Sequence, residues 1–177
     1  MQYLRPVEDG DIPAIAAIYQ HHVLTGTASF EEQPPSADEI RARWRSIHER
    51  ALPYLCLEID DPAAGGQKRL VGYAYAGPYR PRSAYRFTVE DSIYLAPDQA
   101  GRGYGRLLLE RLIADCRALE LREMVAVIGD SGNLASIHLH RALGFRDVGV
   151  FQRVGFKFGR WVDSVLMQLS LQGDSPG

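Results

Sequence analysis

The stretch that decides the fold reads Thr88-Val89-Glu90-Asp91-Ser92-Ile93-Tyr94-Leu95, Ala96-Pro97-Asp98-Gln99-Ala100, Gly101-Arg102-Gly103-Tyr104-Gly105-Arg106 and Leu107-Leu108-Leu109-Glu110. Its first part is rich in β-branched and aromatic side chains, which predicts a strand. Pro97 ends that strand, and a helical pattern begins at Leu107 after three alternating glycines. A strand, a glycine-rich turn and a helix start bring unpaired backbone amides and a positive dipole end together. This combination predicts an anion site, most often for phosphate.

The glycine spacing excludes two common phosphate loops. A Walker loop needs a lysine directly after its second glycine, and no lysine follows these glycines. A dinucleotide-binding loop needs Gly-x-Gly-x-x-Gly, but Arg106 stands three residues after Gly103. The loop resembles instead the acetyl-CoA pyrophosphate loop of the GNAT acetyltransferases, written Gln/Arg-x-x-Gly-x-Gly/Ala. Ala100 takes the Gln/Arg position, with Gln99 one residue earlier, a departure that should cost little in a loop that works through backbone amides. The alternative is a plain glycine-rich turn before a helix.

Composition describes an ordinary globular chain. Its 177 residues suit one domain, and a net charge of -2 gives no field that would attract nucleic acid or an anionic membrane. No apolar run is long enough to span a membrane, and the N-terminus lacks a signal-peptide pattern. Cys56 and Cys116 stand in apolar segments without other ligands at metal spacing, which predicts buried thiols in a reducing compartment. We therefore expect a cytoplasmic protein without a metal, nucleic-acid or membrane partner.

The remaining patterns give a complete order of elements. Strands are expected at 3–7, 54–59, 70–76, 88–95, 124–128, 145–154 and 161–171, and helices at 12–22, 36–50, 107–119 and 134–143. Ser36 with Glu39 forms a capping-box pattern, and Gly144 predicts a left-handed helix cap. The apolar run 124–128 predicts a strand covered on both faces. The fold class is α+β, a mixed and mostly antiparallel sheet flanked by helices on both faces, in one domain over 1–171 with a disordered tail at 172–177.

This order is that of a GNAT domain, and a second family motif follows the loop at the right separation. Asn133-Leu134-Ala135-Ser136-Ile137-His138-Leu139-His140-Arg141-Ala142-Leu143-Gly144-Phe145 resembles the Asn-x-x-Ala/Ser…Leu-Gly-Phe segment of these enzymes. The resemblance implies acetyl-CoA as co-substrate. The implied cofactor residues are Tyr94, Leu95, Arg102, Gly103, Tyr104, Gly105, Arg106, Leu107 and Asn133.

Transfer of an acetyl group to an amine requires removal of a proton from the amine. Glu90 is the candidate base, because strand alternation puts Glu90, Ser92 and Tyr94 on one face and burial beside Val89 can raise a carboxyl pKa. The alternative is an exposed strand acid. His140 lies two helical turns from Asn133 and therefore on the same face. It takes a position where many GNAT enzymes carry a tyrosine proposed as the general acid for the thiolate.

A narrower resemblance comes from a set of three features. Thr88-Val89-Glu90, His140, and the segment Val154-Gly155-Phe156-Lys157-Phe158-Gly159-Arg160-Trp161-Val162-Asp163 together are similar to the phosphinothricin and methionine sulfoximine N-acetyltransferases. This resemblance implies a small amino-acid-like substrate, Glu90 and His140 as catalytic groups, and a homodimer. The implied substrate region is Arg80, Pro81, Arg82, Ser83, Arg86, Asp91 and Ser92. The final segment can equally be structural, with glycines for tight turns.

Two other functions use the same fold. A peptide N-acetyltransferase would favour an acidic groove, whereas Arg80, Arg82 and Arg86 precede the strand that bears Glu90 and suit a carboxylate or phosphinate. A non-catalytic acyl-CoA sensor would keep the glycines and Asn133 but would need neither Glu90 nor His140. The sequence therefore favours a small-molecule N-acetyltransferase that works by direct transfer, and leaves the exact substrate open.

Overall fold

The computed structural model describes residues 1–61 and 65–172, and these form one seven-stranded sheet with the order β1-β2-β3-β4-β5-β7-β6. The strands are β1 (Gln2–Pro6), β2 (Tyr54–Asp61), β3 (Gln67–Pro78), β4 (Thr88–Leu95), β5 (Glu123–Gly129), β6 (Arg146–Lys157) and β7 (Arg160–Ser170). The helices are α1 (Ile12–Thr25), α2 (Ala37–His48), α3 (Tyr104–Ala118) and α4 (Leu134–Ala142). All neighbouring strands are antiparallel except β4 and β5. The predicted order and mixed sheet are confirmed; the tail at 173–177 lies outside the described residues.

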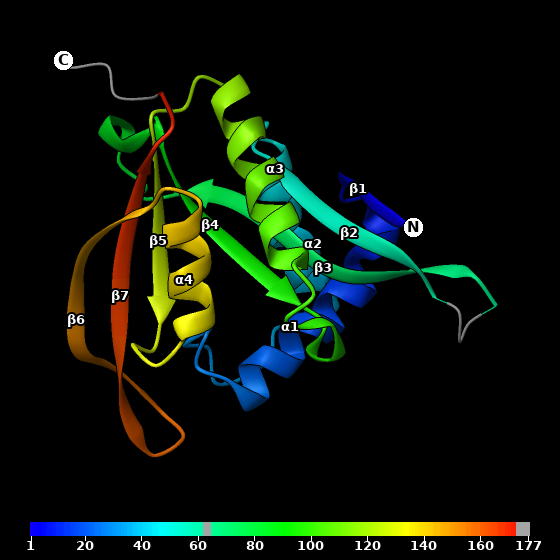
Figure 1. The fold of residues 1–177 in the computed structure, drawn as a ribbon, viewed down its shortest axis with the longest axis horizontal. Helices are drawn as coiled ribbons and strands as arrows, with labels where there is room; N and C mark the ends of the chain where they lie inside the picture. The colour runs from blue at the N-terminus through cyan, green and yellow to red at the C-terminus, as the bar shows by residue number, and fades with distance from the viewer. Residues whose placement is uncertain (62–64, 173–177) are drawn as a thin grey trace.

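Two apolar cores hold helices to both faces of the sheet (Figure 1). The first core packs α3 and α4 on one face through side chains such as Leu108, Leu112 and Ile137. The second packs α1 and α2 on the other face through Ile12, Ile15 and their neighbours. Because side chains alternate along a strand, β4 contributes to both cores, with Val89 in the first and Tyr94 against the second.

The strands β4 and β5 part soon after they meet. They pair only from Thr88 to Glu90 on β4 and from Glu123 to Val125 on β5. Beyond these residues the two parallel strands diverge, so one edge of β4 has no neighbouring strand from Asp91 to Leu95. An unpaired strand edge inside a molecule offers backbone groups to a ligand.

Local signals predicted several details correctly. Ser36 Oγ accepts a hydrogen bond from the Glu39 amide, and Gly144 has a φ of 92°. Two expectations were wrong. Val127 on β5 is 40% exposed, because the departure of β4 opens that face of the strand to a cleft. β6 does not end at Val154: it bulges and resumes at Gly155 opposite Val162, running on to Lys157.

The two cysteines have buried thiols, as the sequence predicted. Cys56 and Cys116 are free and buried, and burial raises the pKa of each thiol to about 12. Within the described residues, no helix combines the length and apolar character needed to cross a membrane.

Candidate active site

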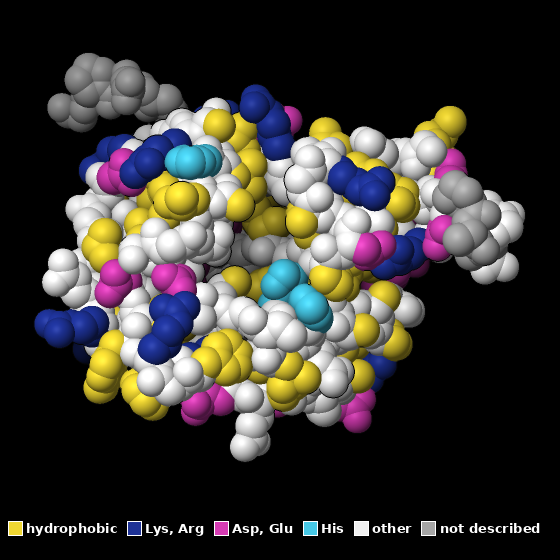
Figure 2. All heavy atoms as spheres, turned by 60° about the horizontal axis from the view of Figure 1, so that its bottom comes forward, with side chains coloured by type: hydrophobic (Ala, Val, Ile, Leu, Met, Phe, Trp, Pro, Cys, Tyr) yellow, Lys and Arg dark blue, Asp and Glu magenta, His cyan; other side chains and the backbone are white. Residues whose placement is uncertain are grey.

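A cleft of about 710 Å³ opens where β4 and β5 part, and Figure 2 shows it as a hollow in one face of the molecule. Its walls are the end of β4, the glycine-rich turn, the end of β5, one face of α4 and the connection after α1. This volume is in the range of sites for ligands of cofactor size.

The glycine-rich turn gives the cleft an anion-binding end. Gly101 and Gly103 have φ values of 75° and 82°, which only glycine adopts without strain, and a Cβ at either position would meet no protein atom within 4 Å. Gly103 precedes α3, and the first helical bond runs from the Leu107 amide to the Gly103 carbonyl. The amides of the first helical residues therefore have no acceptor within the helix and are free for phosphate oxygens.

The predicted cofactor residues of this turn do not all meet the cleft in the same way. Gly103, Gly105 and Arg106 line it, and Arg106 also donates to Glu110. The ring of Tyr104 is buried in the first core. The Leu107 amide donates to the Gly103 carbonyl within the helix, and the Leu107 side chain faces solvent. The exposed Arg102 is not among the lining residues.

The motif implies that Gly105 is glycine for the sake of the phosphate, but in the structure its lack of a side chain also matters for helix packing. Its backbone has an ordinary negative φ, and an added Cβ would lie 3.3 Å from the Leu139 side chain of α4. The residue therefore allows α3 and α4 to approach each other, in addition to lining the cleft.

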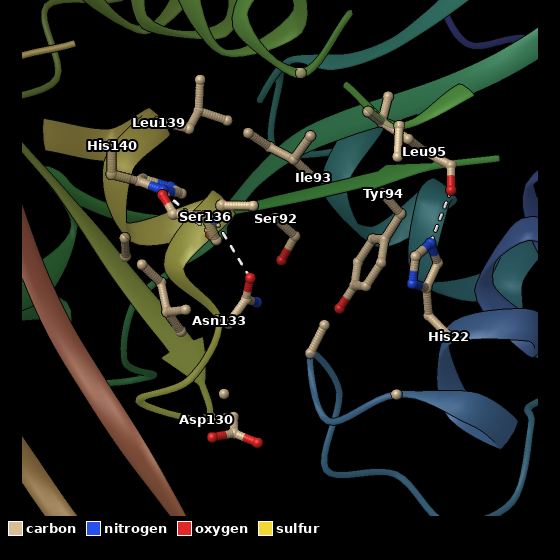
Figure 3. A pocket seen from close by; sticks show the side chains of 18 of the residues that line it. His22, Ser92, Ile93, Tyr94, Leu95, Asp130, Asn133, Ser136, Leu139 and His140 are labelled. Atoms are coloured by element: carbon tan, nitrogen blue, oxygen red, sulfur yellow. Dashed lines mark hydrogen bonds between the residues drawn. The ribbon is translucent and has the colours of Figure 1, made fainter. Parts of the chain in front are cut away.

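The free edge of β4 forms the second wall. The Ala96 amide donates to Val71 on β3, so the Leu95 carbonyl in the same planar peptide points the other way, into the cleft. His22 Nε2 lies 2.8 Å from that carbonyl oxygen, and its ring contacts the Tyr94 ring (Figure 3). Burial lowers the pKa of His22, which favours the neutral ring donating from Nε2. The sequence pattern did not identify His22 as a cleft residue.

The helix α4 forms the opposite wall. Asn133 caps the helix, with its Oδ1 accepting from the Ser136 amide, and both residues line the cleft (Figure 3). The Asn133 side-chain amide nitrogen keeps its donors for a ligand. His140 lies on the same helix face but deeper, and the exposed His138 points elsewhere, as predicted.

His140 and Asp91 form a buried pair that joins α4 to β4. The His140 Nε2 atom lies 3.0 Å from Asp91 Oδ2, and Nδ1 lies 2.7 Å from the Ser136 carbonyl oxygen, so both ring nitrogens have acceptors. Burial acts to lower the pKa of His140, but the hydrogen bond and charge of Asp91, helped by Ser136, outweigh it and raise the pKa. The second oxygen of Asp91, Oδ1, is buried without a hydrogen-bond partner among the described residues.

Glu90 occupies the point where β4 and β5 separate, since it is the last β4 residue paired with β5. It lies on the opposite face of β4 from Asp91 and His140. Burial, and then the neighbouring charge of Asp91, raise the pKa of Glu90, while Arg80 opposes them. A half-buried carboxylate with a raised pKa is suited to accept a proton near neutral pH.

The predicted substrate residues are divided between the surface and the interior. Arg80, Pro81, Arg82, Ser83 and Arg86 are all exposed, and they lie before, within and directly after a short 3-10 turn at Ser83–Tyr85. Of the arginines, Arg80 acts on Glu90 electrostatically, whereas Arg86 lies over the Phe87 ring and donates to the Ser83 carbonyl. Ser92 lines the cleft, and Asp91 is held by His140 instead of facing a substrate at the surface.

Comparison with known proteins fits this geometry. The Acetyltransferase (GNAT) family profile matches residues 15–145, and the chain belongs to that family. A phosphinothricin N-acetyltransferase of Alcaligenes faecalis is 57% identical over 97% of this chain and 84% of its own length. An L-methionine sulfoximine/L-methionine sulfone acetyltransferase of Pseudomonas paraeruginosa is 42% identical over 95% of this chain and 94% of its own.

A solved structure of a relative contains acetyl-CoA. The phosphinothricin acetyltransferase of Sinorhizobium meliloti, determined in complex with acetyl-CoA, superposes with a TM-score of 0.89 at 44% identity, covering 96% of this chain and 88% of that one. The predicted family, fold, N-acetyltransferase class and acetyl-CoA co-substrate are therefore confirmed. Within the part of the chain that is described, no cluster of three or more histidine, cysteine or acidic side chains could hold a metal.

The Asp91–His140 pair leads to a prediction about stability. His140→Gln removes one partner of a buried ion pair, which should lower the free energy of unfolding by about 3–5 kcal/mol. The folded pKa of His140 is raised, so the pair stabilises fully below the unfolded value of about 6.5, and this stabilisation is lost as pH rises through the folded pKa. Urea unfolding of both proteins across this range should show the difference shrinking at high pH. A difference that is constant with pH would contradict a charged pair.

Proposed function

We propose that this protein transfers the acetyl group of acetyl-CoA to the amino group of a small amino-acid-like substrate such as phosphinothricin, methionine sulfoximine or methionine sulfone. The observation that carries the proposal is the position of Glu90: a carboxylate of raised pKa at the point where β4 and β5 separate, next in sequence to the cleft residue Asp91 although not itself lining the cleft, and within the electrostatic reach of Arg80. A base beside a cation suits an acceptor that carries both an amine and an acidic group. The names of the relatives, phosphinothricin and methionine sulfoximine acetyltransferases, support the same substrate class.

In the proposed reaction Glu90 accepts a proton from the substrate ammonium, directly or through a water. The freed amine nitrogen bonds to the acetyl carbon, the carbon–sulfur bond breaks, and the second proton lost by the nitrogen passes through solvent to the sulfur. The open amides at the start of α3 hold the pyrophosphate, and the β4 edge at Tyr94 and Leu95 pairs with the pantetheine arm. Asn133 contributes a donor from the opposite wall.

The role of His140 follows from its two hydrogen bonds. Because Ser136 and Asp91 accept from both ring nitrogens, a direct proton transfer from His140 to the sulfur would require Nε2 to leave Asp91. We therefore propose that His140 supports the reaction indirectly, because its hydrogen bond to Asp91 fixes α4 against β4 at the inner end of the cleft. This role modifies the expectation of a freely accessible acid or second base.

Arg80 provides the test of substrate recognition. Arg80→Ala should raise the KM for phosphinothricin about tenfold or more, because one charged hydrogen bond is worth roughly 1.5–3 kcal/mol. The matched control is Arg86→Ala, since the Arg86 guanidinium already lies over Phe87 and bonds Ser83. Steady-state kinetics at saturating acetyl-CoA give both values. Equal, small changes in the two variants would show that the arginines only solvate this segment.

The assembly and location that the sequence indicated also stay proposals. Exposed apolar side chains gather on the edge strand β6, the turn after it and the start of β7, namely Val148, Val150, Phe151, Val154, Phe156, Phe158 and Trp161. Such an edge suits a second copy, because a two-fold dimer places the same patch on itself. Analytical ultracentrifugation should give a dimer, and a monomer at micromolar concentration would rule it out. Two free buried thiols agree with a cytosolic location.

The direct test of activity is release of CoA by the purified protein. A thiol reagent should detect CoA when acetyl-CoA is mixed with phosphinothricin or methionine sulfoximine, but not with acetyl-CoA alone. A protein that binds acetyl-CoA yet releases no CoA with any amine would instead be the non-catalytic sensor. Peptide N-acetylation, the other alternative, would appear as CoA release with peptides only.

A further inference from the structure

Lys157 and Gly155 have no part in the acetyl transfer and dimer contact proposed above, yet both are unusually placed. Lys157 is only 2% exposed, at the end of the edge strand β6. Its Nζ atom donates to the Gly26 carbonyl at 2.8 Å and to the Ser29 carbonyl at 2.7 Å. A buried ammonium is costly unless it is well hydrogen-bonded. An apolar side chain would fill the same space. The ammonium adds hydrogen bonds to the carbonyls of Ser29 and Gly26, which are 128 and 131 residues away in the sequence.

Two glycines allow the same connection to lie close against the sheet. A Cβ at Gly155 would lie between 2.5 and 3.0 Å from three atoms of the Phe30 ring, and a Cβ at Gly129 would lie 2.1 Å from the Thr27 carbonyl oxygen. Neither glycine has a positive φ. Close approach, and not an unusual backbone conformation, therefore requires glycine at both positions.

Side chains complete the attachment of residues 26–30, which we call the 26–30 loop. Thr27 Oγ1 donates to Asp130, which also accepts from Arg160 on β7. Ser29 is buried, and its Oγ lies 2.8 Å from the Tyr19 hydroxyl. The loop is thus bonded directly to α1 and β6, lies against Gly129 at the end of β5, and reaches Arg160 of β7 only through Asp130.

The 26–30 loop borders both halves of the candidate site. Gly26, Thr27 and Ala28 line the cleft. Glu31, directly after the loop, interacts electrostatically with Tyr75 on β3 and Tyr94 on β4. Both tyrosines lie on the face of the sheet that also bears Glu90. The loop therefore stands as a wall between the end of the cleft and the side from which an amine would approach Glu90.

We propose that Lys157 and Gly155 are positioning residues for the acceptor substrate: they clamp the 26–30 loop so that the amine-binding side has one fixed shape. This inference rests on the proposed acetyl transfer. Neither residue lines the cleft: both contact the 26–30 loop, and three residues of that loop line the cleft. Small displacements of such a wall are amplified in the reaction, since misplacement by about 1 Å can cost about 10²-fold in rate.

The experiment compares Lys157→Met, which keeps an unbranched apolar chain but no donor, with Gly155→Ala, which inserts one methyl group against Phe30. The matched control is Gly149→Ala on the same strand, where a Cβ meets nothing within 4 Å. Steady-state kinetics give the KM for phosphinothricin, calorimetry gives the Kd for acetyl-CoA, and hydrogen exchange with acetyl-CoA bound follows the amides of 26–31.

Lys157→Met and Gly155→Ala should each raise the KM for phosphinothricin about tenfold or more and should change the Kd for acetyl-CoA far less. Both should also speed hydrogen exchange of the amides of 26–31. Gly149→Ala should leave all three quantities at their wild-type values. An unchanged KM for phosphinothricin with unchanged exchange in 26–31 would overturn the proposal. So would an equal weakening of phosphinothricin and acetyl-CoA binding together with a general loss of stability. If Lys157→Met does not fold, Gly155→Ala decides. If the wild-type protein acetylates no small amine, the proposed function has failed, and with it the acceptor role; exchange in 26–31 then still decides whether the hairpin clamps the loop.

Discussion

Replacing Glu90 with glutamine is expected to lower kcat by about 10²–10⁴-fold, the usual contribution of a general base. The variant keeps the size and hydrogen-bonding shape of the side chain but cannot accept a proton. Burial and the charge of Asp91 raise the pKa of Glu90, so wild-type kcat/KM should fall as pH decreases through that raised pKa. The variant should lose this acidic limb.

Two measurements separate this result from a general loss of structure. The Kd for acetyl-CoA, measured by calorimetry, should be unchanged in Glu90→Gln. Glu49→Gln, at the exposed end of α2, is a matched control and should keep the wild-type rate. A Glu90→Gln variant with a near-normal rate across the pH range would show that Glu90 is structural.

The second large effect is expected at Gly103, which stands at the start of α3 with a φ of 82°. Valine is strongly disfavoured in this left-handed conformation, and its branched Cβ would enter the open side of the turn. Displacing the first α3 amides removes charge-assisted hydrogen bonds worth roughly 1.5–3 kcal/mol each. Loss of two such bonds should weaken acetyl-CoA binding by about 10²-fold or more.

Gly66→Val controls for backbone strain alone, because Gly66 has a φ of 85° on the hairpin between β2 and β3 and does not line the cleft. Both variants should lose stability in thermal unfolding. Only Gly103→Val should lose affinity in a calorimetric titration with acetyl-CoA. Undiminished affinity in Gly103→Val would remove the glycine-rich turn from the acetyl-CoA site.

Local features of this fold were readable from sequence because each depends on neighbouring residues. Pro97 and the alternation before it predict β4 at 88–95, the bounds that the structure has. Ser36 with Glu39 and Gly144 fix helix ends through hydrogen bonds and a backbone conformation within one turn. The family motifs around Gly103 and Asn133 add the fold and the co-substrate, since both motifs line one cleft.

The features of the site that sequence did not identify, the residue His22 and the pairing of Asp91 with His140, depend on contacts between distant segments. His22 meets Leu95 across 73 residues, and Asp91 meets His140 across 49. Strand alternation predicted that Glu90 and Asp91 face opposite sides, but not that Asp91 pairs with His140 while Glu90 stands where β4 and β5 separate. The exposed Val127 was misjudged for a related reason: an apolar run indicates a strand but not where its neighbour departs.

The most direct test of the central claim is a competition in one reaction. Phosphinothricin, methionine sulfoximine, spermidine and a peptide with a free N-terminus are mixed at equal concentrations with limiting acetyl-CoA, and mass spectrometry measures each acetylated product. The product ratios give the ratios of kcat/KM. The account predicts that acetylated phosphinothricin or methionine sulfoximine dominates. Acetylated spermidine or peptide, with neither amino-acid analogue acetylated, would contradict it.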